Sequence, residues 1–272
     1  MSKLYVVGTP IGNLSDLSPR AVETLGAVDF IAAEDTRVTL KLLNHFNIKK
    51  PMISYFEHNK RERGEMICAR ILAGESCAIV TDAGMPCISD PGEDLIKLCA
   101  EKGIETVVVP GPSAVISALA ISGLDTGRFC FEGFLSVNKK SRRDHLESLK
   151  DEKRTMIFYE APHKLPSTLR DLYEFFGDRK LSIVRELTKI HEEAIRTTTK
   201  IAAEQLADSG IKGEIVLVLE GKKDDGSAKY TLKQAVSLAE KLVAEGAKIS
   251  DAAKEAARVS GFKKNDIYKE LV

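Results

Sequence analysis

The feature that most constrains this fold is a repeated order of short apolar run, glycine- and proline-rich loop, and helix. The apolar runs lie at residues 4–8, 28–33, 76–81 and 106–109. Strands that alternate with helices predict an α/β domain with a largely parallel sheet. Ligands of such sheets bind at the carboxyl ends of the strands, so the loops after these runs are the expected site.

Local signals indicate where several helices begin and end. Ser18 before Pro19 predicts an N-cap followed by the first helical residue. Asp90 stands three residues before Glu93, which predicts a capping box for a helix that ends at Gly103.

A second α/β unit begins near Phe129. Its expected strands lie at residues 129–134, 155–159, 181–185 and 215–219, and its expected helices at 141–149 and 167–176. The polar stretch 221–227 predicts a linker. Short helices around the turn at 260–262 then predict a helix-turn-helix. We therefore expect two α/β domains, at 1–124 and 125–222, and a small C-terminal helical domain at 228–272.

Charge and composition narrow the function classes. The 40 Lys and Arg residues balance the 40 Asp and Glu residues, which argues against a basic nucleic-acid clamp. Residues 228–272 nevertheless carry nine basic and six acidic side chains, a basic appendage on a mildly acidic body. The five cysteines form no C-x-x-C pair, so we expect reduced cysteines and no metal site. No apolar run spans a membrane and no signal peptide is visible, which predicts a cytoplasmic protein.

The glycines of the first loop exclude two common nucleotide-binding motifs. Gly8 and Gly12 lack the G-x-G-x-x-G spacing, and Pro10 stands where that motif needs a closely approached backbone. The Walker lysine pattern is absent as well. NAD-dependent oxidoreductases and P-loop NTPases are therefore disfavoured.

Several loop segments, taken in order, resemble those of the tetrapyrrole-methylase superfamily. They are VGTPIGNL at 7–14, AEDTR at 33–37, TDAGMP at 81–86, ISDPG at 88–92, VPGPSA at 109–114, YEAPHKL at 159–165 and KGEI at 212–215. Met85 stands where the family often has threonine. Within the superfamily, the chain resembles the small-subunit ribosomal RNA methyltransferases, which methylate the ribose 2′-oxygen of a cytidine. The resemblance implies that the partner is small-subunit ribosomal RNA and that the protein is a homodimer.

The resemblance also implies S-adenosylmethionine as cofactor, bound in a folded conformation between the two α/β domains. The cofactor-binding positions carried over are Pro10, Ala83, Gly84, Ile88, Ser113, Ala114, Ala161, Leu187 and Gly213. We expect Gly84 and Gly111 to approach the cofactor through their backbones. Free N–H groups at the start of the helix after Ser113 suit the methionine carboxylate.

Methyl transfer to a ribose hydroxyl needs a base, because a neutral hydroxyl is a poor nucleophile. The candidates at strand ends are Glu34, Asp35, Asp82, Glu160, His163 and Glu186, and we carry Glu34, Asp35, Glu160 and His163 forward as catalytic residues. Each has a structural alternative: Asp35 suits a helix cap equally well. Asp90 is expected to be a cap rather than a catalyst.

Basic side chains supply the expected RNA contacts. They are Arg37, Lys139, Lys140, Arg142, Arg143, Lys263 and Lys264. A solvated surface is the alternative for the clusters, and an ion pair with Glu34 is the alternative for Arg37. Two rival functions stay open: a methylase of a tetrapyrrole or corrin, and a non-catalytic RNA-binding assembly factor that keeps the cofactor fold.

Overall fold

A computed structural model describes residues 2–207, 209–223 and 231–272, and divides the chain into two compact units. The first unit is Met1–Lys222 and holds two five-stranded sheets, and the second is Lys223–Val272. Residues 224–227 of the predicted linker lie outside the described residues. The three predicted domain ranges stay a prediction.

The first sheet is parallel throughout, as the alternating pattern predicts. Its strands run in the order β3-β2-β4-β1-β5. They are β1 (Leu4–Val7), β2 (Phe30–Ala33), β3 (Met52–Ser54), β4 (Cys77–Val80) and β5 (Thr106–Val109). Strand β3 at one edge is an addition to the expected set.

Helices cover both faces of this sheet, which explains why its inner strands are continuous apolar runs. They are α1 (Pro19–Ala27), α2 (Thr36–His45), α3 (Lys60–Leu72) and α4 (Glu93–Glu101), with a 3₁₀ turn at Leu14–Asp16. Leu25 and Leu43, from α1 and α2, pack with Ile31 on one face. Ile67 and Leu95, from α3 and α4, pack with Phe30 on the other.

The two predicted helix starts have opposite outcomes. The Ser18 hydroxyl accepts a hydrogen bond from the Ala21 N–H at 3.1 Å, so this cap is confirmed. The capping box at Asp90 is wrong, because the N-cap of α4 is Gly92 and makes no side-chain bond. Ser89 and Gly92 have φ values of 62° and 138°, and this irregular backbone leaves the Asp90 carboxyl in contact with the Thr81 side chain.

The second sheet is mixed and runs in the order β6-β7-β10-β8-β9, with β6 and β7 parallel and the other pairs antiparallel. Its strands are β6 (Phe129–Phe134), β7 (Thr155–Glu160), β8 (Lys180–Arg185), β9 (Glu193–Thr198) and β10 (Ile215–Leu219). The sequence predicts four of these strands, and β9, at the edge, is the addition.

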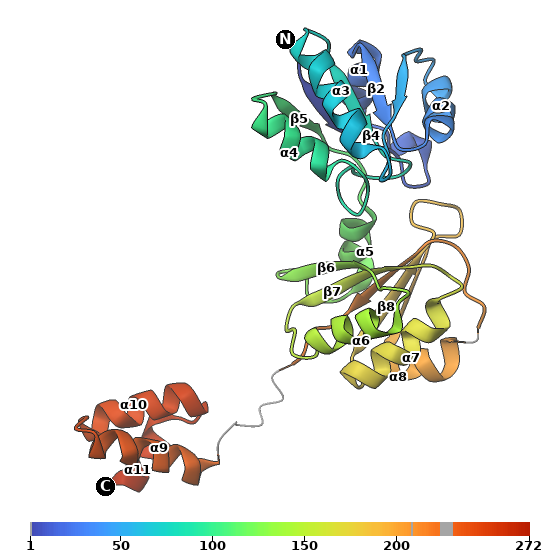
Figure 1. Cartoon of the computed structure of the whole chain (residues 1–272). Helices are drawn as coiled ribbons and strands as arrows, with labels where there is room; N and C mark the ends of the chain where they lie inside the picture. Colours follow the sequence, from blue (N-terminus) through green and yellow to red (C-terminus); the bar gives the residue numbers. More distant parts are fainter. Residues whose placement is uncertain (1, 208, 224–230) are drawn as a thin grey trace. The chain divides into compact units, whose positions relative to one another are not determined.

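Helices also cover this second sheet on both faces. Helices α6 (Lys139–Ser148) and α7 (Leu165–Phe176), with α8 (Thr199–Ile201) and the π-helical turn Ala202–Leu206, lie on one side (Figure 1). Helix α5 (Ala114–Ser122) packs on the other side through Val115, Ala118 and Leu119. Helix α6 begins at Lys139 rather than at the predicted residue 141, because Asn138 caps it. The basic residues Lys139, Lys140, Arg142 and Arg143, which we call the basic cluster, therefore all belong to this helix.

The C-terminal unit has its own apolar core. Helices α9 (Leu232–Ala244), α10 (Ile249–Ser260) and α11 (Lys264–Leu271) bury alanines around Ile267. The turn at 260–262 is confirmed, with Gly261 in the left-handed conformation at φ 79°. Helix α10 has Lys248 as its N-cap. None of the described helices is long and apolar enough to cross a membrane.

The loops at the carboxyl end of the first sheet are bound to one another. Thr9 and Gly84 exchange two backbone hydrogen bonds, of 2.9 and 3.1 Å. A Cβ atom added to Gly111 would lie 2.8 Å from the backbone of Gly8, and one added to Gly8 would lie 2.7 Å from Gly111. The absence of a side chain at Gly111 therefore serves packing against Gly8, whereas the loop motif alone predicts contact with the cofactor.

We expect Gly111→Ala to destabilise the first unit by about 1–3 kcal/mol, because its methyl group has no space beside Gly8. Gly26→Ala is the matched control, since an added Cβ there meets nothing within 4 Å and helix α1 gains up to about 1 kcal/mol. Denaturant unfolding measures both. A Gly111→Ala protein as stable as the parent would show that the loops separate without cost.

Candidate functional site

A cavity of about 390 Å³ lies where the loops of the first sheet meet the second sheet. Its volume is in the range of small-molecule sites. Its lining residues are Ile11, Ala83, Ser89, Asp90, Ala114, Phe134, Tyr159, Glu160, Ala161, Pro162, Leu187, Gly213, Glu214, Ile215 and Val216. We call this space the central cavity. It uses the loops after β1 and β4 and the start of α5, as expected for ligands of α/β sheets.

The structure brings together five of the nine positions predicted for the cofactor. Ala83, Ala114, Ala161, Leu187 and Gly213 line the central cavity. The other four, Pro10, Gly84, Ile88 and Ser113, are not among its lining residues.

Aromatic residues form part of the lining that the sequence did not single out. The rings of Phe134 and Tyr159 lie 5.4 Å apart, and burial raises the pKa of the Tyr159 hydroxyl. Both residues lie at the ends of strands, and this position is the sequence feature that could have indicated a place in the site.

Glu186 holds the backbone on one side of the central cavity. Its carboxylate accepts a hydrogen bond from the Glu214 N–H at 2.9 Å and pairs with Lys189 at 3.0 Å. The bond from the Glu214 backbone, followed by the one from Lys189, lowers the pKa of Glu186. A Cβ atom on Gly213 would lie 2.5 Å from the Glu186 side chain. A glycine at this position therefore allows the Glu186 carboxylate to bind the backbone beside it.

Asp35 lies at the start of α2 as its N-cap. Its carboxylate accepts the Arg37 N–H at 2.8 Å and binds the Arg37 guanidinium at 3.0 and 2.6 Å. The side-chain bonds from Arg37, with the backbone bond, lower the pKa of Asp35 to about 2. Arg37 therefore pairs with Asp35, and the alternative of a pair with Glu34 is wrong.

Thr81 lies between two carboxylates at the carboxyl end of β4. Its hydroxyl donates to Glu34 at 2.6 Å and also contacts the carboxyl group of Asp90. Because a hydroxyl has one proton, it donates to only one of the two at a time. Burial, followed by the charge of Glu34, raises the pKa of Asp90 to about 6. Asp90 lines the central cavity and Glu34 does not.

Glu160 is buried at the end of β7 and lines the central cavity. One carboxylate oxygen accepts the Ala161 N–H at 2.8 Å, and the other accepts the Thr168 hydroxyl. One oxygen is therefore engaged by the β7–α7 connection and the other by helix α7. His163 lies in the same turn with an exposed side chain, outside the lining of the cavity.

Most of the basic cluster surrounds a second cavity, of about 480 Å³, between α6 and α7. Lys139, Arg142 and Arg143 line it, and Lys140 does not. Lys263 and Lys264 belong to the C-terminal unit, where Lys264 donates to the Ser250 hydroxyl at 2.9 Å.

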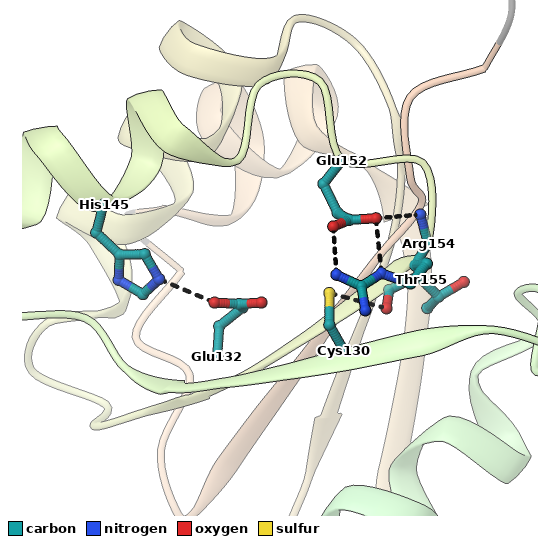
Figure 2. Close-up of polar contacts among 6 residues, drawn as sticks. All are labelled: Cys130, Glu132, His145, Glu152, Arg154 and Thr155. Atoms are coloured by element: carbon teal, nitrogen blue, oxygen red, sulfur yellow. Dashed lines mark hydrogen bonds and ion pairs between the residues drawn. The ribbon is translucent and has the colours of Figure 1, made fainter.

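Polar contacts fix α6 to the second sheet. Glu132 stands at a bulge in β6, and its carboxylate meets the His145 imidazole of α6 at 2.9 Å (Figure 2). In the connection from α6 to β7, Glu152 and Arg154 form a pair at 2.6 Å. The contact between Glu132 and His145 thus holds α6, and with it the basic residues of its first turn, against the second sheet.

The cysteines and acidic groups give no indication of a metal. All five cysteines are free, and Cys68, Cys77 and Cys99 are buried. Within the described ranges, no group of three or more His, Cys, Asp or Glu residues is arranged to hold a metal ion.

Comparison with known proteins decides the family. The sequence model of the Tetrapyrrole (Corrin/Porphyrin) Methylases matches residues 3–203. The chain is 46% identical, over 98% of its length and 96% of the relative's, to Ribosomal RNA small subunit methyltransferase I of Synechocystis sp.. The chain belongs to the tetrapyrrole methylases. Within them, it belongs to the family of ribosomal RNA small subunit methyltransferase I.

Other members of these families differ in extent and in sequence. The relative from Thermotoga maritima is 50% identical over 223 residues, which cover 82% of this chain and all of that protein. Among solved structures, uroporphyrin-III C-methyltransferase from Thermus thermophilus, complexed with S-adenosylhomocysteine, superposes with a TM-score of 0.57. Its sequence identity is 16%, and the match covers 80% of this chain and 97% of that one. This likeness concerns the fold.

Proposed function

We propose that this methyltransferase transfers a methyl group from S-adenosylmethionine to the ribose 2′-oxygen of a cytidine in small-subunit ribosomal RNA. The observation that carries the proposal is the 46% identity, over nearly the whole chain, to a relative named for small-subunit ribosomal RNA. The homodimer, implied by the family resemblance, and the cytoplasmic location, expected from the sequence, stay predictions.

The central cavity fits the proposed cofactor. Ala83, Ala114 and Ala161 leave room beside the backbone, and the rest of the lining is mostly apolar. Ser113, the N-cap of α5, makes no side-chain cap, so N–H groups of the first turn are available to a carboxylate. The sulfonium of S-adenosylmethionine supplies an electrophilic methyl group, which leaves positioning and proton removal to the protein.

We propose that Asp90 accepts the proton of the ribose hydroxyl. It lines the central cavity, and its raised pKa of about 6 suits a base that works near neutral pH. Asp35 is bound by Arg37, and both oxygens of Glu160 are engaged, by the Ala161 N–H and the Thr168 hydroxyl. The catalytic roles of Glu34, Asp35, Glu160 and His163 stay untested predictions.

The proposed reaction predicts methyl transfer to small ribosomal subunits that requires the 2′-hydroxyl. Labelled methyl from S-adenosylmethionine should enter small-subunit RNA, and a target 2′-deoxycytidine should abolish it, because the acceptor atom is gone. Transfer to the deoxy substrate would point to a base atom. Transfer to a porphyrinoid, with none to subunits, would favour the tetrapyrrole rival. Cofactor binding by calorimetry without any turnover would favour the assembly factor.

Asp90→Asn should lower kcat by about 10²–10⁴-fold, the usual contribution of a general base. In the parent enzyme, kcat should fall as the pH decreases through about 6, because only the ionised carboxylate accepts a proton. Cofactor affinity, measured by calorimetry, should persist in the variant. Asp94→Asn, a surface residue of α4 paired with Lys60, is the control and should keep the parent kcat. Parent-like kcat in Asp90→Asn would refute the assignment.

We further propose that the C-terminal unit binds RNA through Lys263 and Lys264. The C-terminal unit has its own core, and the match to the relative from Thermotoga maritima covers all of that protein with 223 residues. Both observations support that the methylase part folds without the C-terminal unit. Truncation after Lys223 should raise KM for subunits and leave cofactor affinity unchanged. The double variant Lys263→Ala, Lys264→Ala should reduce the slope of log K for RNA binding against log salt concentration. The reduction should be roughly one for each phosphate that is no longer neutralised. Full activity of the truncated enzyme would exclude this role, and its unfolding would indicate a structural role instead.

A further inference from the structure

The cavity between α6 and α7, which we call the α6–α7 cavity, is lined by basic, acidic and polar residues together with Val137, Leu146 and Phe175. It has a volume of about 480 Å³, and its lining includes residues at the beginning of both helices. Its charged lining residues are Lys139, Arg142, Arg143, Lys164, Asp171 and Glu174. Four cations against two carboxylates leave an excess of positive charge, to which the N-termini of the two helices add.

The cations of the α6–α7 cavity differ in how they are held. Arg142 is fixed, because its guanidinium binds Asp171 at 2.6 Å and the Thr168 hydroxyl at 2.8 Å. By contrast, within the described residues no hydrogen bond or ion pair engages the ammonium groups of Lys139 and Lys164. These two lysines are therefore available to an anion from outside the chain.

The α6–α7 cavity and the central cavity share two connections of the chain. Phe134, the last residue of β6, lines the central cavity, and Ser136 of the β6–α6 connection lines the α6–α7 cavity. On the β7–α7 connection, Pro162 lines the central cavity and Lys164 the other. A polymer that enters the central cavity thus has the basic Lys164 two residues farther along the β7–α7 connection, and the polar Ser136 two residues beyond Phe134.

Hydrogen bonds also join the two cavities. Thr168 accepts the Arg142 guanidinium and donates to Glu160, which in turn accepts the Ala161 N–H. Thr168 and Glu160 are buried. Arg142, which lines the α6–α7 cavity, and Glu160, which lines the central cavity, are therefore joined through Thr168 in one hydrogen-bond network.

We infer that the α6–α7 cavity binds a backbone phosphodiester of the substrate RNA, next to the nucleotide held at the central cavity. Lys139 and Lys164 supply the direct charge, while Arg142 is a positioning residue held by Asp171 and Thr168. The inference rests on the proposed function, and it specifies which part of the RNA this surface recognises. The carboxylates of Asp171 and Glu174 restrict the cationic surface to part of the lining.

The test is direct RNA binding by the full-length double variant Lys139→Ala, Lys164→Ala. The probe is a small-subunit ribosomal RNA fragment that contains the target cytidine, titrated by fluorescence anisotropy at several salt concentrations. The slope of log K against log salt should become less steep by about 0.7 to 0.9 for each phosphate that the variant no longer neutralises. Affinity at low salt should fall about tenfold, with cofactor affinity and thermal unfolding unchanged.

Lys97→Ala with Lys102→Ala is the matched control, since it removes the same charge from α4 and the residue after it, where the two lysines pair with Glu93 and Glu65. An equal loss of RNA affinity in this control, or no change in the cavity variant, overturns the inference. Failure of the proposed function is distinguished separately. In that case the parent enzyme does not methylate the fragment at all, whereas the titration still reports whether phosphate binds at Lys139 and Lys164.

Discussion

The site depends on the close packing between loops at the carboxyl end of the first sheet. Gly8 lies against Gly111, and Thr9 is bonded to Gly84 on the neighbouring loop. Interiors packed to this density do not accept an added methyl group without a shift of the backbone. The packing fixes where β5 ends and where α5 begins, and α5 then packs on the second sheet. Loop packing in one sheet thereby determines the position of the helix that covers the other.

The electrostatics of the first unit separate into two regions with different chemistry. Around Thr81, Glu34 and Asp90 share one hydroxyl, and burial raises the pKa of Asp90. Around Arg142, cations line the α6–α7 cavity. A carboxylate with a raised pKa is a stronger base than an ordinary one and is still ionised near neutral pH, which suits proton removal. A cationic surface suits the phosphates of a nucleic acid. A methyltransferase that acts on RNA needs both, which is consistent with the family of this chain.

Sequence reasoning failed where the local signal was weak or ambiguous. Strand β9 lies at a sheet edge with alternating polar residues, and β3 has three half-buried residues, so neither shows an apolar run. Helix α3 begins with a charged stretch, which conceals its buried face. At Asp90 the capping pattern was present but the backbone did not follow it, because Ser89 and Gly92 adopt positive φ values.

By itself, the sequence determined the parallel first sheet, most of the second sheet, and the family. Buried strands appear as apolar runs, and loop motifs at their carboxyl ends keep their order along the chain. Only the tertiary structure decided which loop residues face the central cavity, that Arg37 binds Asp35, and why Gly111 lacks a side chain. Most of those properties depend on pairs of residues far apart in the chain, such as Gly8 with Gly111 and Arg142 with Thr168. No local pattern of residues encodes the distance between such partners.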